Sequence, residues 1–325
     1  MRCRLLISFM LLFFLLVNSP ASARILKVAA LFTGAVGNEW NYVIHSAILK
    51  GKGEFGYFYT YRDKLTPPGL VHMARKFAAS GYDIIYADGF AAERSLRFVA
   101  RRFPKVRFVV ASDSGPVKPN VSVFDDWIQE PAYLCGMIAG RLTKTNMVGA
   151  VGSYPVPNVN RLINAFIMGA REVNPKVRVK IEFVGSWYAP KKAGSLAAFY
   201  IAAGVDMMFA VTPGVIEVCK DKGILAFGCL QDKHTIAPDT VVTSAVWDFY
   251  PTVRFVTFSV LTGTWVSTDL REWSMMAKGG AKLAPFYAFA TKLPTSVLRM
   301  VETRKEEIVS GKFYVPVDER YPKSD

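Results

Sequence analysis

The chain has 325 residues, which suits about two domains of roughly 150 residues each. Hydrophobic residue types make up 51% and charged types 20%, which excludes a disordered chain, a coiled coil and a collagen-like fibre. The formal net charge is +14, and the four cysteines form no C-x-x-C pair, so a disulfide scaffold is also excluded.

The first 23 residues have the pattern of an export signal. Arg2 and Arg4 precede the apolar run 5–17, and the small residues of 18–23 end in an A-x-A cleavage site. The run is shorter than the ~20 residues that span a bilayer, which favours a cleavable signal peptide over a membrane anchor. We therefore expect an exported protein whose net charge is 38 − 26 = +12 after cleavage.

From residue 25 onward, β-rich runs alternate with helical patterns. The predicted strands are 25–32, 56–61, 83–87 and 106–111, and the predicted helices are 38–50, 68–79, 91–102 and 129–143. Strand followed by helix, repeated in this way, implies right-handed βαβ units and a parallel sheet.

The same alternation restarts after residue 146. The expected strands are 147–152, 178–184, 206–211, 224–228 and 241–247, and the expected helices are 158–173, 191–203, 213–222, 249–261 and 295–310, with an extended segment at 283–286. Two consecutive parallel sheets predict an α/β protein with two lobes. We expect an N-terminal lobe at 24–145 with a return segment at about 249–280, a C-terminal lobe at 146–248, and a closing segment at 281–325 that either lobe could hold.

Three cysteines remain after the signal peptide, so at least one thiol is free. Cys135 lies in an apolar helical run and is expected to be buried. Cys219 and Cys229 flank a helix end and the next strand, a placement that permits a disulfide. Two separate buried thiols are the alternative.

Common catalytic and cofactor motifs are missing from the sequence. Gly34 and Gly37 follow the first strand, but they do not form G-x-G-x-x-G, and there is no Walker loop, G-x-S-x-G elbow or H-E-x-x-H motif. We therefore expect no enzyme activity, metal or cofactor. The basic residues are spread along the chain in short clusters, which favours a solvated face over a nucleic-acid site.

Aromatic residues stand where strands give way to helices. Trp40 follows the first strand, Phe90 the third, and Trp187 the strand at 178–184, while Trp247 ends the strand at 241–247 and precedes Asp248. Ligands of parallel sheets bind outside the carboxyl ends of the strands. Aromatic faces there can sandwich a flat heterocycle, at about 1–3 kcal/mol per stacked base. The alternative is that these rings only pack the lobe edges.

Motifs along nearly all of residues 25–325 resemble the basic membrane protein family of ABC-importer substrate-binding proteins for nucleosides and purines. The matching segments are Gly81-Tyr-Asp-Ile-Ile-Tyr86, Gly89-Phe90, Phe103-Pro104, Tyr133-Leu-x-Gly136, Val148-Gly-Ala-Val-Gly-Ser153, Asn174-Pro175, Gly204-Val-Asp206, Ala226-Phe-Gly228 and Ser244-Ala-Val246. The resemblance implies the type I periplasmic-binding-protein fold, with two Rossmann-like lobes joined by crossover strands that act as a hinge.

Departures from the family pattern narrow the expected ligand. Nucleoside-binding members carry an Asp and a Lys that contact ribose, and Leu230 and Trp247 occupy those positions here. The segments Trp40-Asn-Tyr-Val-Ile-His45 and Ser186-Trp-Tyr-Ala-Pro190 are similar to a proteobacterial branch that looks like a free-nucleobase (adenine) binder, although Ala189 replaces its usual Asp.

We therefore predict a monomeric, periplasmic substrate-binding protein that captures an adenine-like purine between its lobes and delivers it to an inner-membrane permease. Trp40 and Trp187 are predicted to stack on the base. Asn41 and Asp248 are predicted to form hydrogen bonds with its edge, and Phe90 and Trp247 to form the walls of the site. The alternatives are a nucleoside-binding protein, a periplasmic purine sensor and an exported nucleoside hydrolase.

Overall fold

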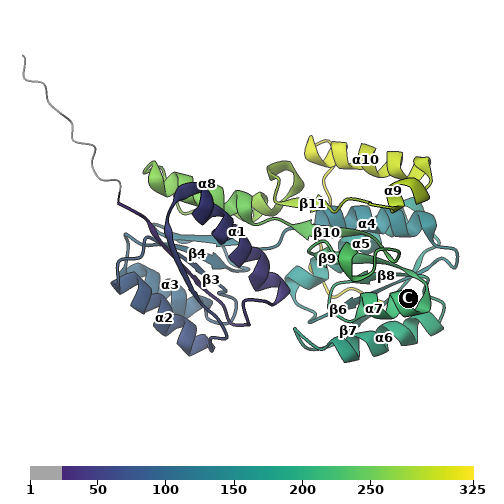
Figure 1. The fold of residues 1–325 in the computed structure, drawn as a ribbon, viewed down its shortest axis with the longest axis horizontal. Coiled ribbons are helices and arrows are strands. Elements are labelled where there is room, and N and C mark those ends of the chain that lie inside the picture. Colours follow the sequence, from purple (N-terminus) through teal and green to yellow (C-terminus); the bar gives the residue numbers. More distant parts are fainter. Residues whose placement is uncertain (1–23) are drawn as a thin grey trace, which may run out of the picture.

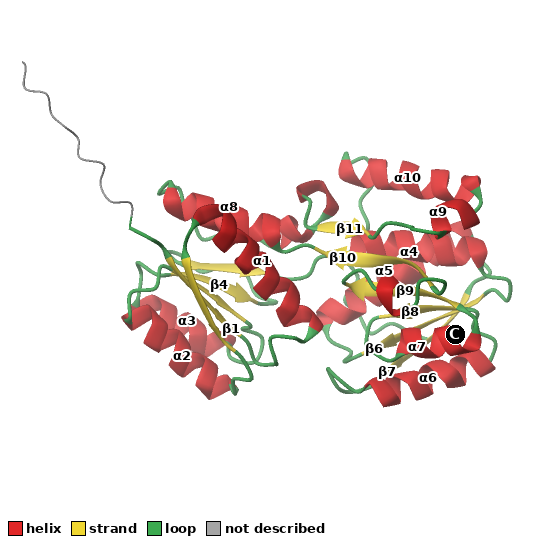
Figure 2. Ribbon diagram, in the orientation of Figure 1, coloured by secondary structure: helices red, strands yellow, loops and turns green. Residues whose placement is uncertain are grey.

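The computed structural model describes residues 24–325. The predicted signal peptide lies outside this range. Two α/β lobes lie side by side along the long axis of the molecule (Figure 1), each built on its own mostly parallel sheet (Figure 2). This arrangement confirms the fold class expected from the alternating pattern.

The N-terminal lobe holds a five-stranded parallel sheet with strand order β2-β1-β3-β4-β5. Its strands are β1 (Lys27–Leu31), β2 (Phe58–Arg62), β3 (Ile84–Ala87), β4 (Arg107–Ala111) and β5 (Val121–Phe124). Its helices are α1 (Glu39–Phe55), α2 (Pro67–Ala79), α3 (Glu93–Arg102) and α8 (Tyr250–Leu261). Helices α2 and α3 cover one face of the sheet, and α1 and α8 cover the other (Figure 1). Strands buried on both faces explain the continuous apolar runs in the sequence.

The second sheet has six strands in the order β11-β10-β9-β8-β6-β7, with β11 antiparallel to β10. Its strands are β6 (Met147–Gly152), β7 (Arg178–Phe183), β8 (Met207–Ala210), β9 (Leu225–Leu230), β10 (Val241–Trp247) and β11 (Ala281–Leu283). The helices around it are α4 (Gln129–Leu142), α5 (Pro157–Val173), α6 (Pro190–Ala202), α7 (Val215–Lys222), α9 (Phe289–Lys292) and α10 (Thr295–Val309).

Helix α4 packs with the second lobe, although the lobe boundary was expected after it, near residue 145. Glycines bring its backbone against α5: a Cβ on Gly136 would lie 1.9 Å from the Phe166 carbonyl oxygen, and one on Gly169 would lie 2.0 Å from the Tyr133 carbonyl oxygen. No side chain fits at either position. This close approach, together with the contacts of α4 with β10, β11 and α10, ties the helix to the second sheet.

Three chain segments pass between the lobes and lie against one another. The first follows β5, the second joins β10 to α8, and the third returns from α8 to β11. The third runs beside β5, where Val123 N–H donates to the Thr268 carbonyl at 3.2 Å and Leu270 N–H donates to the Val123 carbonyl at 2.7 Å. The second is bonded to the third through Asp248 N–H and the Gly280 carbonyl at 2.8 Å. We call these three segments, together with the strand-end residues Phe124 and Trp247 from which the first two start, the hinge.

The cysteines are buried and unbridged among residues 24–325. The disulfide that Cys219 and Cys229 were thought able to form is therefore absent, and the alternative of separate thiols is confirmed. The reason is tertiary: Cys219 packs between the sheet and helices α6 and α7, whereas Cys229 belongs to the core on the opposite face of the same sheet. Within the described range, no helix combines the length and hydrophobicity needed to cross a bilayer.

Candidate ligand-binding site

The loop after β1 is held in place by Asn41, a buried residue in the first turn of α1. Its side-chain amide donates to the Ala35 carbonyl at 2.9 Å, and on the far side of the loop Val36 N–H donates to the Asp63 carboxylate at 2.9 Å. Asn41 is predicted to bind the edge of a ligand, but its N–H₂ group is engaged with its own loop. These hydrogen bonds hold the loop that leads into α1.

Trp40, at the start of α1, lies in a cluster of aromatic rings at the carboxyl ends of the strands. Its ring centroid is 4.7 Å from that of Trp247, 6.0 Å from Phe90 and 6.4 Å from Phe124, the last nearly parallel at 14°. The indole N–H of Trp40 is buried and has no hydrogen-bond partner among residues 24–325. The structure therefore brings three predicted site residues together and adds Phe124.

Trp247 forms the base of this aromatic cluster. It is 2% exposed, its indole N–H donates to Ser274 Oγ at 2.9 Å, and its ring lies 5.2 Å from Phe249. Sequence reasoning missed Phe124, although it carries the same signal as the others, an aromatic residue at the end of a strand. Trp247 and Phe124 both belong to the hinge, so the ring of Trp40 rests directly on hinge residues.

Asp88 is a second residue that sequence reasoning left out of the site. It follows β3, two residues before Phe90, and its carboxylate accepts a hydrogen bond from the Thr33 hydroxyl at the end of the neighbouring β1. Burial raises the pKa of the Asp88 carboxyl, and the Thr33 hydrogen bond opposes the rise. No cation within residues 24–325 pairs with this carboxylate, and Phe90 beside it is 38% exposed.

Trp187, the other half of the predicted stacking pair, lies in the loop after β7. It is 59% exposed, and its ring meets only one aromatic neighbour among the described residues, Tyr154, edge to face at 5.0 Å. Tyr154 follows β6, so both rings belong to the carboxyl ends of strands in the second sheet. The structure does not bring Trp187 into contact with Trp40.

The two lobes meet beside Trp40 through a polar contact. Lys233 Nζ forms an ion pair with the Glu39 carboxylate, and Gln231 Nε2 donates to the Glu39 carbonyl at 3.5 Å. Leu230, which ends β9, has a φ of +63°, a left-handed conformation that bulky side chains rarely adopt. The turn at Leu230 directs the following residues toward the start of α1.

Asp248 is engaged at the start of α8. Its carboxylate accepts the Tyr250 backbone N–H at 3.0 Å and lies 3.8 Å from Lys282 Nζ. Asp is a favoured residue for satisfying the unpaired N–H groups of a helix start, so this contact has a structural purpose.

A buried ionic cluster lies in the hinge. Arg161 of α5 is 1% exposed; its guanidinium donates to Asp125 at 2.6 Å and to Glu319 at 2.5 Å, and lies 3.4 Å from Asp126. The Trp127 ring lies 5.4 Å from the same guanidinium. Burial, followed by the charge of Asp125, raises the pKa of Asp126, and Arg161 opposes the rise. These contacts join the first hinge segment to the second lobe.

Within residues 24–325, no group of His, Cys, Asp and Glu is arranged to hold a metal ion.

Residues 25–274 match the family model Bmp, described as ABC transporter substrate-binding protein PnrA-like. The chain belongs to this family. It is 35% identical over 239 residues to a purine-binding protein of Brucella abortus, covering 73% of this chain and 66% of that protein. It is 26% identical over 270 residues to a putative ABC transporter glucose-binding protein of Haloferax volcanii, covering 81% of this chain and 67% of that protein.

The fold also matches solved structures. An ABC transporter solute-binding protein from Conexibacter woesei superposes with a TM-score of 0.74 at 24% identity, over 90% of this chain and 99% of that one. The family match identifies a substrate-binding protein of an ABC transporter, and the solved structure shows the same fold. Proteins of this class bind a small molecule outside the cytoplasm and deliver it to a permease.

Proposed function

We propose that this member of the Bmp family binds a free purine base, adenine-like, between the carboxyl ends of its two sheets. The observation that carries the proposal is the placement of aromatic rings there. Trp40 and Phe90 stand at one sheet, and Trp187 stands largely exposed at the other. A flat heterocycle held between two such faces gains about 1–3 kcal/mol per stacked ring.

The polar groups around these rings suit a purine edge. The Asp88 carboxylate has one hydrogen bond, from Thr33, and its remaining lone pairs can accept N–H groups of a base. The buried indole N–H of Trp40 is a donor without a partner among residues 24–325, which a ring nitrogen or carbonyl of the ligand would satisfy. A purine offers donors and acceptors on adjacent atoms, so both groups can be used at once.

The same surroundings are poorly suited to ribose. Leu230 and Trp247 stand where nucleoside-binding members of the family carry charged ribose contacts, and Trp247 is buried with its only N–H bonded to Ser274. Ribose hydroxyls buried without partners cost about 1–3 kcal/mol each. The proposal is therefore a free base rather than a nucleoside.

Delivery to the transporter would follow the usual sequence for two-lobed binding proteins. The ligand would bind at the open strand ends, the hinge would bend, and Trp187 would approach Trp40 across the base. The closed form would then be recognised by an ABC permease in the inner membrane, with the binding protein in the periplasm as a monomer. The alternative of a purine sensor uses the same site and the same closure.

The decisive experiment measures ligand class. Thermal unfolding and calorimetric titration with adenine, hypoxanthine, adenosine, inosine and glucose should show that free purines stabilise the protein most. A ligand at 100 times its Kd adds about 2.7 kcal/mol of stability. Larger shifts with nucleosides would assign the site to nucleosides, larger shifts with glucose would assign it to sugars, and release of free base from a nucleoside would reveal a hydrolase.

A further inference from the structure

The outer helical layer of the N-terminal lobe is strongly basic. Between residues 67 and 107 there are eight basic and three acidic residues, a balance of 8 − 3 = +5. The three acids are all engaged: Glu93 pairs with Arg97 at 2.5 Å, Asp83 pairs with Arg24 at 3.0 Å, and Asp88 lies at the strand end with Thr33. The remaining cations of this layer therefore have no carboxylate partner among the described residues.

These cations gather on one exposed surface, which we call the α2–α3 face. It consists of His72, Arg75, Lys76, Arg94, Phe98, Arg101, Arg102 and Lys105, all exposed. Phe98 is 47% exposed in the middle of the row, with the guanidinium carbons of Arg102 and Arg101 at 4.7 and 5.7 Å from its ring centre. Residues three and four apart on a helix share a side, which explains why Phe98 and its arginines face solvent together.

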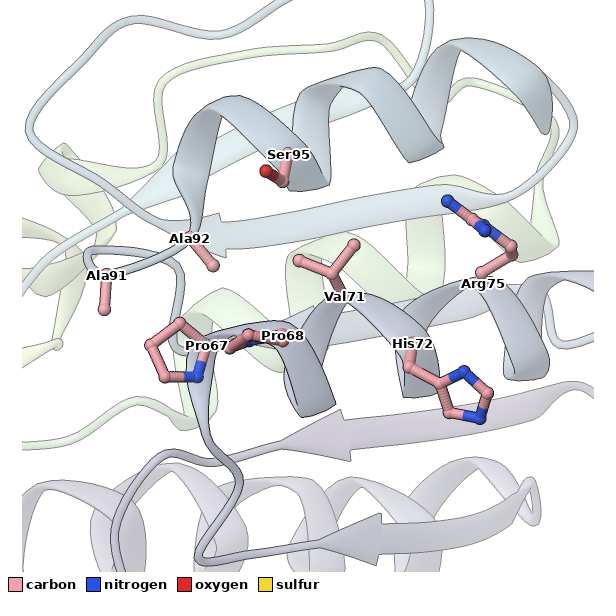
Figure 3. Close-up of a pocket in the computed structure, with 8 residues that line it drawn as sticks. All are labelled: Pro67, Pro68, Val71, His72, Arg75, Ala91, Ala92 and Ser95. Carbon is pink, nitrogen blue, oxygen red and sulfur yellow. The ribbon is translucent and has the colours of Figure 1, made fainter.

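Two shallow grooves lie along the α2–α3 face. The first has a volume of about 430 Å³ and runs between the starts of α2 and α3, where Val71 and Arg75 face Ala92 and Ser95 (Figure 3). The second, of about 410 Å³, lies at the other end of the layer; its lining includes Arg24, Arg102 and Lys105, along with the rings of Tyr82 and Phe103. Each groove is lined by apolar side chains together with at least one arginine.

The equivalent layer of the second lobe lacks this character. Between residues 190 and 222, which include α6 and α7, four lysines face three acidic residues, a balance of 4 − 3 = +1. Lys220 and Lys222 on α7 are exposed but flank Asp221. The α2–α3 face is therefore not a general consequence of the basic composition.

We propose that the α2–α3 face binds peripherally to an anionic phospholipid bilayer. Its arginines and lysines would contact lipid phosphates, and Phe98 would enter the interfacial region between them. An exposed aromatic ring within a row of cations suits a bilayer interface better than a purely polar acidic protein surface. The face lies on the opposite side of the sheet from α1 and α8 (Figure 1), so docking leaves the hinge free to move.

Sedimentation with vesicles tests this inference without any transporter present. Wild-type protein should bind vesicles of phosphatidylcholine with about 30% phosphatidylglycerol and not vesicles of phosphatidylcholine alone; the binding should disappear near 0.5 M NaCl as surface charges are screened. Each neutralised cation should weaken partitioning about five-fold, so Arg101→Gln/Arg102→Gln should lose about 30-fold. Phe98→Ala should weaken it several-fold without changing the net charge.

The matched control is Lys220→Gln/Lys222→Gln, which removes the same charge from α7. It should retain wild-type vesicle binding, and all variants should keep the wild-type melting temperature and ligand affinity. Equal binding to both vesicle types, or equal loss in the α7 control, would overturn the inference. Because ligand titration is measured separately, this outcome is distinguishable from failure of the purine proposal.

Discussion

The carboxyl ends of the two sheets present very different surfaces to a ligand. In the N-terminal lobe, Trp40 is half-buried and packed against rings of the hinge, with Trp247 at 4.7 Å. In the C-terminal lobe, Trp187 is 59% exposed, and Tyr154 is its only aromatic neighbour among residues 24–325. The surface around Trp40 is therefore ordered before a ligand binds, whereas few contacts hold the Trp187 side chain in place.

This difference separates stability from binding. A ring that packs a core contributes to folding whether or not a ligand is present, and a ring exposed in the free protein contributes only when a ligand covers it. The preorganised surface also costs less to use, because its side chains lose little freedom on binding. Substitutions on the two sides should therefore fall into two distinguishable classes.

The largest expected effect comes from the buried ionic cluster of Arg161, which joins the hinge to the second lobe. Arg161→Met leaves Asp125 and Asp126 buried without their counter-ion, which should cost about 3–5 kcal/mol of unfolding free energy at pH 7. The deficit should shrink as pH falls, because burial raises the pKa of the Asp126 carboxyl and protonation neutralises it. Denaturant unfolding at pH 7 and pH 5 measures both effects. Arg171→Met on the same helix removes an exposed pair with Asp325 and should cost under about 1 kcal/mol.

Trp40→Ala should reduce both stability and affinity. Removing a buried Trp costs about 3–5 kcal/mol, and the half-buried ring of Trp40 should cost about 2–3 kcal/mol. Affinity for a purine should fall about 5- to 150-fold through the lost stacking. Denaturant unfolding and calorimetric titration separate the two. Unchanged stability would contradict the preorganised surface, and Trp40→Phe should recover part of both losses.

Trp187→Ala should affect binding alone. The exposed ring makes little contact in the free protein, so unfolding free energy should stay within about 0.5 kcal/mol of wild type. Purine affinity should drop about 5- to 150-fold. Phe199→Ala, an exposed aromatic of α6 in the same lobe, should change neither quantity. A loss of stability with unchanged affinity would move Trp187 from the site to the lobe core.

Asp88→Asn should weaken binding about ten-fold without destabilising the fold, because a charge-assisted hydrogen bond to the ligand is lost. Burial raises the folded-state pKa of Asp88 above its unfolded value, so its contribution to stability is present below about pH 3.9 and lost as pH rises through the folded-state pKa. The gain in stability of the neutral variant over wild type should therefore be greater at pH 7.5 than at pH 4. Thermal unfolding at both pH values checks this sign.

The matched control for Asp88 lies at the other end of the same strand. Asp83 precedes β3 and accepts hydrogen bonds from Lys27 N–H and Arg24, far from the strand ends where the ligand is proposed to bind. Asp83→Asn should leave purine affinity unchanged. If both variants bind purine like wild type, Asp88 is not a ligand contact, whatever the pH dependence of its stability.

Asp248→Asn should change stability little. The side-chain oxygen of Asn can accept the Tyr250 N–H as the carboxylate does, so stability should stay within about 0.5 kcal/mol. Affinity should fall about ten-fold if the carboxylate also holds the base, as predicted from the sequence. Calorimetric titration decides, and unchanged affinity would leave Asp248 with its structural role alone.

Much of the fold was predictable because its signals are local. Apolar runs buried on both faces, alternating with helical segments, predict parallel βαβ units, and the structure confirms two sheets built this way. Strand β5 was missed because Val121–Phe124 is too short to show a pattern of its own. The grouping of Trp40, Phe90 and Trp247 was also predictable. Each follows or ends a strand, and parallel strands place their carboxyl ends at one edge of a sheet.

Only the tertiary structure determines which residues pair when they are far apart in sequence. Thr33 with Asp88, Arg161 with Asp125, and Glu39 with Lys233 each depend on which strands and helices become neighbours. The same cause separates Cys219 from Cys229 onto opposite faces of one sheet and packs Trp247 into the hinge. A local pattern states which residue types a segment carries, but side chains meet only when burial of apolar surface brings whole elements together.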